Sequence, residues 1–371
     1  MKLYRYRPIT NFLFKELLYQ EIYLASFSEL NDPLDMTTHV NFHTAEIADA
    51  RNLARFVCGR ILRDQIRLAL KEDKLGVDRR NRDSVVEVLN DAARLDELAA
   101  EILRHMTDCD SQGTIDVDGL FGVLSTINSC RSSEFPFLGQ LSTVRDDIDA
   151  TIAVFLNNSY VACFAEKADN FLMWSHYADR HQGICLEFET PRQSDTECQF
   201  PVEMCGRPKE DNDKTPHRLN VELWRFDQTA RRVNYVRTIE PLRFYDFLPV
   251  FANEGDIDLH ELSKSRWHPF ADLLRSTFLQ KQKRWKSEKE WRIIEVNFKK
   301  GNLPEDRIYR YNINALTGIV FGYRTAAQVR RRTCRIVRAK SNDVIFYQAK
   351  MNNDATLSIV ESDENDVENV E

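Results

Sequence analysis

A long helical stretch interrupts a chain that otherwise reads as short strands, and this interruption constrains the fold more than any other feature. Residues 44–158 contain runs such as AEIADARNLARFVCGRILRDQIRLAL, with Leu53, Phe56, Val57 and Ile61 at helical spacing. A second run repeats the pattern with three apolar side chains, Leu95, Leu98 and Ile102. We therefore read this stretch as a mostly helical insertion rather than a linker.

The segments on both sides of the insertion are typical of strands, because polar and apolar residues alternate in them. They are KLYRYRPI, IYLASFSEL, SYVACFAEK, GICLEFE, RRVNYVR, KEWRIIEVNF, LTGIVFGYR, TCRIVRAK and LSIVE. This order predicts an α+β fold with a mixed or antiparallel sheet core. We expect residues 1–350 to form a single domain, with the insertion at about 44–158 packed on it.

Charge is distributed unevenly along the chain. The formal net charge is −7, and the segment 361–371 carries six acidic residues and no basic one. We expect 351–371 to contain the end of a strand followed by a disordered acidic tail. Basic residues gather instead at 281–292 and 330–340. These clusters could bind a phosphate-bearing ligand, although for either run alone a solvated face is the simpler reading.

No stretch approaches the ~18 to 20 apolar residues of a membrane span, and the first residues lack the apolar core of a signal peptide. We expect a cytoplasmic protein with no membrane partner. The eight cysteines include no CxxC pair, so most should be buried thiols. Cys198 with Cys205, or His176 with His181, could bind zinc, but no third ligand is obvious and we expect no metal. Cys163 lies inside an apolar strand, which argues against a nucleophile.

Local signals place the polar residues. Asn11 is a plausible N-cap for the helix NFLFKELLYQE, and Asp169 or Asn170 for the helix around FLMWSHYAD. The sequence NDP predicts an Asx-type turn in which Asn31 and Asp32 bond their own backbone; the alternative places them at the mouth of a pocket.

Two pairs of charged residues stand out. Arg5 and Arg7 alternate on the first strand, so both can point at one anion. Glu288 and Glu290 precede Arg292 at the start of another strand. Salt bridges offer an ordinary structural explanation for both pairs.

Four blocks of this sequence resemble a bacterial family known only as domain of unknown function 2971. The blocks are YRYRPIT, IYLASFSELNDPLD, ACFAEKADNFLMWSHYADRHQGICLEF and KRWKSEKEWRII. The resemblance runs from the first residues to about residue 350, and the helical insertion is poorly matched. This family name implies no activity.

A second resemblance, to the ADP-ribosyltransferase fold, implies an NAD-consuming enzyme. Those enzymes use an Arg on a first strand, then a hydroxyl residue, then a Glu that often follows a second Glu. The counterparts here are Arg5 or Arg7, then Ser26, Ser28 or Tyr177, then Glu290 with Glu288.

The resemblance also implies roles for these residues. Glu290 would hold the ribose and its cation, and Glu288 would orient or deprotonate the acceptor. An early Arg would hold the diphosphate, and Trp174 or Tyr177 would stack on nicotinamide. His176, Asn31, Asp32 and Arg292 would border the site. NAD is then the substrate, the acceptor is a nucleic acid or protein, and such an enzyme would be a toxin or phage-defence effector.

Two alternatives stay open. A metal-dependent nuclease could use Asp32, Glu288 and Glu290 with Lys286 or Lys289. A non-catalytic module could use the basic clusters to hold a nucleotide-type small molecule or a partner protein.

Overall fold

The computed structural model describes most of the chain. The described residues are 1–36, 39–72, 79–109, 115–130, 135–140, 144–146, 148–149, 153, 156–200, 202–204, 229–246, 272–296, 303–354 and 356–362. Contacts divide the chain into two compact units. Unit 1 comprises Met1–Met36, Asn157–Ile239 and Phe278–Glu371, and unit 2 comprises Thr37–Leu156 and Glu240–Thr277. The expected insertion corresponds closely to the first segment of unit 2; its packing on a single domain stays a prediction.

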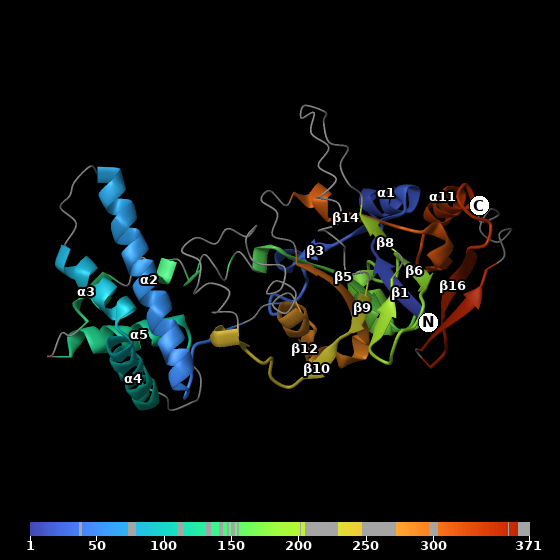
Figure 1. Ribbon diagram of the computed structural model, residues 1–371. Coiled ribbons are helices and arrows are strands. Elements are labelled where there is room, and N and C mark those ends of the chain that lie inside the picture. Colours follow the sequence, from blue (N-terminus) through green and yellow to red (C-terminus); the bar gives the residue numbers. More distant parts are fainter. Residues whose placement is uncertain are drawn as a thin grey trace, which may run out of the picture. The chain divides into compact units, whose positions relative to one another are not determined.

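Unit 1 is built on a ten-stranded mixed sheet (Figure 1), which confirms the α+β class. The strand order is β17 (Leu357–Glu361), β16 (Ile345–Met351), β15 (Leu316–Phe321), β6 (Ile184–Glu189), β1 (Lys2–Arg7), β5 (Ser159–Ala165), β13 (Glu290–Val296), β9 (Thr229–Arg232) and β7 (Glu197–Gln199). The tenth strand, β3 (Ala25–Ser26), also pairs with β5. The β15–β16 pair is parallel, and the other described pairs of this sheet are antiparallel.

Smaller elements of unit 1 accompany this sheet. A three-stranded sheet contains β2 (Glu21–Tyr23), β14 (Ile308–Tyr311) and β8 (Val202–Met204), and a parallel pair contains β10 (Asn234–Val236) and β12 (Gln280–Gln282). The α-helices are α1 (Asn11–Tyr19), α7 (Phe171–Tyr177) and α11 (Ala327–Arg338). Short 3₁₀ helices are η1 (Phe27–Glu29), η3 (Lys283–Glu288), η4 (Pro304–Arg307) and η5 (Ile313–Ala315).

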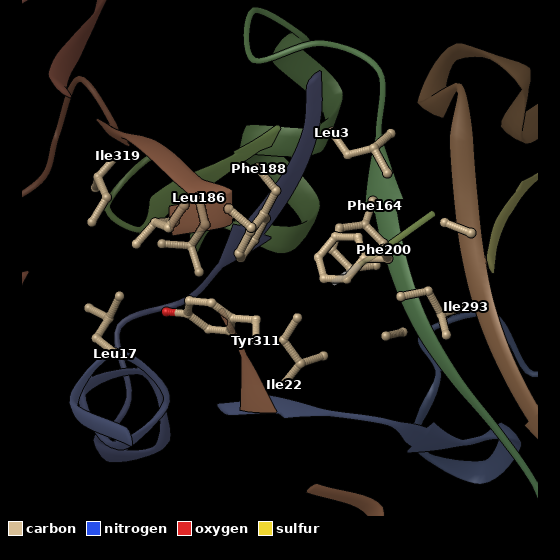
Figure 2. Packing of buried hydrophobic residues seen from close by; sticks show 14 of the residues in the cluster. Leu3, Leu17, Ile22, Phe164, Leu186, Phe188, Phe200, Ile293, Tyr311 and Ile319 are labelled. Atoms are coloured by element: carbon tan, nitrogen blue, oxygen red, sulfur yellow. The ribbon is translucent and has the colours of Figure 1, made fainter. Parts of the chain in front are cut away.

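Alternation along the strands divides the core of unit 1 between the two faces of the sheet. On β1, Leu3 belongs to a cluster that includes Phe164 and Phe188 (Figure 2), whereas Tyr6 belongs to a second cluster with Trp174 of α7. Both clusters are fully packed apolar cores of the kind that stabilises a domain. The side chain of Leu3 is completely buried.

Unit 2 is mostly helical. Its elements are β4 (Val40–Asn41), α2 (Ile47–Glu72), α3 (Arg79–Asn90), α4 (Ala92–Cys109), α5 (Val117–Ser129), η2 (Pro136–Gln140) and β11 (Leu242–Arg243). The predicted apolar stripes of α2 and α4 are buried along their length. The ring of Phe244 packs 4.5 Å from that of Phe42, and β11 pairs with β4. The segment from residue 240 therefore belongs to this unit, which the sequence did not indicate.

Two local predictions need correction, and others lie outside the described residues. The segment TCRIVRAK, expected as a strand, lies mostly in α11, where Thr333 and Val337 are buried one helical turn apart. The N-cap of α1 is Thr10, whose Oγ1 accepts the N–H of Leu13, rather than Asn11. Residues 363–371 of the acidic tail and Cys205 lie outside the described residues. Within the part of the chain that is described, no helix combines the length and apolarity needed to cross a membrane.

Candidate functional site

The large sheet of unit 1 forks beside β5, and the candidate site lies at this fork. Ala165 pairs with Tyr4 of β1, but Val161, four residues earlier, pairs with Ala25 of β3. Between these two points β1 and β3 diverge, and a pocket of about 240 Å³ lies there. Its lining includes side chains from four separate segments: Arg5, Arg7, Asn31, Tyr177, Glu288 and Glu290.

A cluster of buried charges forms one wall of this pocket. Lys281 Nζ lies 2.7 Å from Glu288 Oε2, 2.7 Å from Glu290 Oε2 and 3.2 Å from Asp35 Oδ2. On the other side of Glu290, Arg292 Nε donates to Glu290 Oε1 at 2.7 Å, and its Nη2 donates to Asp35 Oδ2 at 2.6 Å. Three carboxylates therefore share two cations, and every one of these side chains is at least nine-tenths buried.

The local fold explains how Glu288 and Glu290 both face this cluster. Glu288 ends the 3₁₀ helix η3, and Lys289 adopts a left-handed conformation with φ 47° before β13 begins at Glu290. The backbone N–H of Glu290 donates to Tyr235 Oη at 2.8 Å, which fixes the start of the strand. Alternation along β13 then places Arg292 on the same face as Glu290.

The pKa values of the two glutamates move in opposite directions, because the nearby cations outweigh burial at Glu290 but not at Glu288. Burial acts to raise the pKa of Glu290, but the charges of Arg292 and Lys281 outweigh burial and lower this pKa to about 2. The pKa of Glu288 is raised, because burial and the negative charge of Glu290 outweigh the attraction of Lys281. Burial would lower the pKa of Lys281, but the surrounding carboxylates raise it, so the ammonium stays charged. Glu290 is thus held ionised, while Glu288 can take up a proton.

Tyr177 connects Glu288 to the surface. Its hydroxyl donates to Glu288 Oε1 at 2.7 Å and accepts from Asn31 Nδ2 at 3.1 Å. Burial, followed by the charge of Glu288, raises the pKa of Tyr177, so the phenol keeps its proton. Asn31 is exposed, so hydrogen bonds run from the rim of the pocket to a buried carboxylate.

Arg5 and Arg7 share one face of β1, as alternation predicts, and both line the pocket. Arg5 Nη2 donates to the carbonyl of Tyr23 at 2.9 Å, and Arg7 Nη2 lies 2.6 Å from Glu16 Oε1. Arg5 Nη1 and Arg7 Nε have no hydrogen-bond partner among the described residues. Burial, and then the charge of Arg7, lowers the pKa of Arg5 to about 10, which leaves it protonated near neutrality. Unpaired buried donors of this kind favour an anionic ligand.

The sharp turn after α7 brings β6 close to β1. Asp179, Arg180 and His181 all have positive φ, and a Cβ on Gly183 would lie 2.2 Å from the carbonyl oxygen of Arg7. Only glycine fits this approach without backbone movement. Gly183 therefore fixes the position of the strand end that carries Arg7.

Two aromatic residues of α7 do not meet the ligand-binding expectation. The ring of Trp174 is fully buried, its Nε1 donates to the carbonyl of Ala168 at 2.7 Å, and Tyr6 packs on it edge-on. Trp174 therefore has no free face to stack on nicotinamide, which corrects that expectation. His176 is exposed and its ring lies beside Trp285 rather than in the pocket lining.

The side chains of the candidates Ser26, Ser28 and Asp32 are engaged in local hydrogen bonds. Ser26 Oγ and Ser28 Oγ lie 3.0 Å apart, and neither belongs to the pocket lining. Asp32 Oδ1 accepts the N–H of Leu34 at 3.0 Å, which confirms the Asx-type turn for Asp32, whereas Asn31 lines the pocket as the alternative reading placed it. Its Oδ2 accepts from Trp285 Nε1 at 2.6 Å. Of the hydroxyl residues considered for the middle position, Tyr177 is the one that reaches the pocket.

Sequence reasoning missed three residues of this site. Asp35 lies three residues beyond the turn that drew attention, and its Oδ1 has no hydrogen-bond partner among the described residues. Lys281 stands at the start of a basic run whose other lysines are exposed. Cys163 lines the pocket, and its thiol forms a hydrogen bond with the carboxylate of Glu290. Burial raises the thiol pKa well above its ordinary value, in line with the expectation that Cys163 is not a nucleophile.

Comparison with known proteins gives one match. A family model described as a protein of unknown function (DUF2971) matches residues 173–293, which confirms the resemblance to that family over this range. The matched segment contains most of α7 together with Lys281, Glu288 and Glu290. No curated protein and no solved structure matches the chain, and the likeness to ADP-ribosyltransferases stays a prediction. Among the described residues, no group of three His, Cys, Asp or Glu side chains is arranged to hold a metal ion.

Proposed function

We propose that unit 1 is an enzyme that cleaves the N-glycosidic bond of a nucleotide-type substrate at the forked sheet, with NAD as the substrate to test first. One observation carries the proposal: two buried carboxylates, Glu288 and Glu290, have pKa values that move in opposite directions beside a pocket. Such a separation is how proteins assign distinct roles to neighbouring carboxylates. Arg5 and Arg7, whose Nη1 and Nε respectively are unpaired among the described residues, supply a place for phosphate.

Glu288 is the residue we assign to proton transfer. When the bond between ribose C1′ and the nicotinamide nitrogen breaks, its electron pair leaves with nicotinamide and a ribosyl cation remains. The O–H group of water or of another acceptor then attacks C1′, and its proton passes to ionised Glu288. A raised pKa makes Glu288 a stronger base near neutral pH than an ordinary glutamate.

Glu290 is better suited to holding Lys281 and Arg292 in place than to stabilising the ribosyl cation directly. Its two oxygens are already bonded by Arg292 and Lys281, so most of its charge is compensated within 3.1 Å. With Glu288 ionised, the cluster holds three carboxylates against two cations, and the surplus negative charge would stabilise a ribosyl cation in the pocket. With Glu288 protonated, the cluster is neutral.

The size of the pocket limits what it can enclose. At about 240 Å³ it is smaller than the ~300 to 1,000 Å³ of typical ligand pockets. We expect it to enclose the nicotinamide ribose end, with Tyr177 beside the ring and Arg5 near the first phosphate. The adenosine half would then lie outside.

The geometry favours this proposal over a metal-dependent nuclease. A two-metal nuclease needs its carboxylates to converge on a cation, but here the Lys281 ammonium occupies the position between Asp35, Glu288 and Glu290. A binding module would not use Glu288 as a base, so only an experiment on NAD release can distinguish it from an enzyme. An enzyme of the proposed kind would act in the cytoplasm, where NAD is consumed, and would serve as a toxin or phage-defence effector.

The proposal is tested by incubating the purified chain with NAD labelled in the nicotinamide ring and following its release, with and without a chelator. We expect release that survives the chelator and is lost in Glu288→Gln, which keeps the shape but removes the basic charge. Glu189→Gln on β6 is the matched control, because Glu189 is exposed. NAD binding without release by the wild-type chain would indicate a binding module, and chelator-sensitive nucleic acid cleavage would indicate a nuclease.

A further inference from the structure

The segment around α11 is strongly basic. Residues 323–340 contain seven cations and no acidic residue, although the chain has a formal net charge of −7. The cations are Arg324, Arg330, Arg331, Arg332, Arg335, Arg338 and Lys340. A concentration of one sign of charge on a chain of the opposite sign points to an anionic partner.

Packing directs part of this charge to solvent. Thr333 and Val337 are buried beneath the helix, and Arg332 lies with its guanidinium 3.8 Å from the ring centre of Phe14 on the neighbouring helix α1 (Figure 1). On the opposite flank Arg330 Nη1 donates to Gln348 Oε1 of β16 at 3.2 Å. Arg335, three residues after Arg332 and five after Arg330, is exposed to solvent.

A depression of about 380 Å³ lies at the N-terminal end of α11. Its lining includes Arg330, Lys350 and the ring of Tyr323, which is 42% exposed. Arg324 is exposed next to Tyr323. A hollow with cations and an accessible aromatic ring has the groups on which single-stranded nucleic acid is held, since phosphates pair with the cations and bases stack on the ring.

We infer that the hollow lined by Tyr323, Arg330 and Lys350, together with the exposed Arg324 and Arg335 of the same basic segment, binds single-stranded nucleic acid. An anionic membrane surface fits less well, because a membrane-bound helix needs an apolar outward stripe, whereas the side chains that α11 exposes include Gln328, Arg332 and Arg335. The inference is independent of the chemistry proposed above, because it concerns binding without NAD.

The experiment measures fluorescence anisotropy of a labelled 20-nucleotide single-stranded DNA with the full chain at several salt concentrations. Four phosphate contacts predict a slope of about −2.8 in log K against log salt, equivalent to roughly 50-fold weaker binding at 200 mM than at 50 mM. The double variant Arg324→Ala/Arg335→Ala should reduce the slope to about −1.4. Tyr323→Ala should weaken binding at least about fivefold without changing the slope.

The matched control is Arg82→Ala/Arg104→Ala, which removes two exposed arginines from unit 2 and should bind DNA as the wild type does. Circular dichroism checks that each variant is folded. Three results would overturn the inference: no binding at 50 mM salt, equal binding by the α11 variant and the control, or binding to phosphatidylserine vesicles in place of DNA. Binding that appears only after removal of residues 363–371 would also overturn it, because the acidic tail would then be the natural occupant.

Discussion

Replacement of Lys281 by Met should reveal how strongly the carboxylate cluster depends on its central cation. The Lys281 ammonium contacts Glu288 and Glu290 at 2.7 Å and Asp35 at 3.2 Å. Met fills a similar volume but carries no charge. In the variant, Arg292 alone would face three buried carboxylates.

The expected loss of stability is about 3–5 kcal/mol at pH 8, the range found when one partner of a buried ion pair is removed. The loss should shrink as the pH falls to 5. Without Lys281 the folded-state pKa values of the carboxylates rise above their unfolded values, so ionisation destabilises the fold at high pH and protonation relieves it at low pH.

Urea unfolding followed by tryptophan fluorescence reports on this change, because Trp174, Trp285 and Trp291 lie in unit 1. With an m-value of about 3 kcal/mol/M, the midpoint should fall by roughly 1 to 1.7 M at pH 8. Lys286→Met is the matched control: Lys286 is exposed in η3, the 3₁₀ helix that follows β12, so its removal should change stability by less than about 0.5 kcal/mol. A midpoint shift equal to that of the control, or an equal loss at pH 5 and pH 8, would refute the reasoning.

Three further predictions follow from the same geometry. Glu290→Gln should cost about 3 kcal/mol at pH 7, because its pKa of about 2 lies below the ordinary 4.5; this difference should disappear as the pH falls from 4.5 towards 2 in thermal unfolding. Gly183→Ala should lower stability by about 1–3 kcal/mol in the same assay, because the added Cβ meets the Arg7 carbonyl; an unchanged melting temperature would contradict this. Tyr177→Phe removes a hydrogen bond that lowers the pKa of Glu288, so the rising limb of the pH–rate profile for NAD cleavage should move to higher pH; an unmoved limb would argue against Glu288 as the base.

Much of the architecture could be predicted from the sequence because alternation and helical periodicity are local. The strands β1, β5, β6 and β13 were expected from their patterns and lie together in one sheet. The segment TCRIVRAK was misread because Thr, Ile and Val favour strands, whereas the four-residue spacing of Thr333 and Val337, which α11 buries, suits a helix.

The candidate site was predictable only in part. Arg5, Arg7, Glu288 and Glu290 stood out by their spacing. Lys281, the cation that lies between the two glutamates, did not. Lys281 resembles its neighbours in sequence, and it differs only because β12 pairs with β10 and η3 turns Glu288 back towards it. No local signal could show which of several lysines would be buried between carboxylates.

Trp174 shows the converse limitation. From the sequence, an aromatic residue at helical spacing could either pack in the core or stack on a ligand. Trp174 packs in the core, because it is buried against Tyr6. That burial depends on strand β1, which lies more than 160 residues earlier in the chain.

The most direct test of the central claim is nicotinamide release from NAD by the wild-type chain compared with Glu288→Gln, measured alongside NAD affinity. If Glu288 is the base at the forked sheet, the wild type releases nicotinamide, and Glu288→Gln binds NAD with similar affinity but loses turnover by about 100-fold or more. Undiminished release by Glu288→Gln, or a wild-type chain that neither binds nor cleaves NAD, would contradict the account.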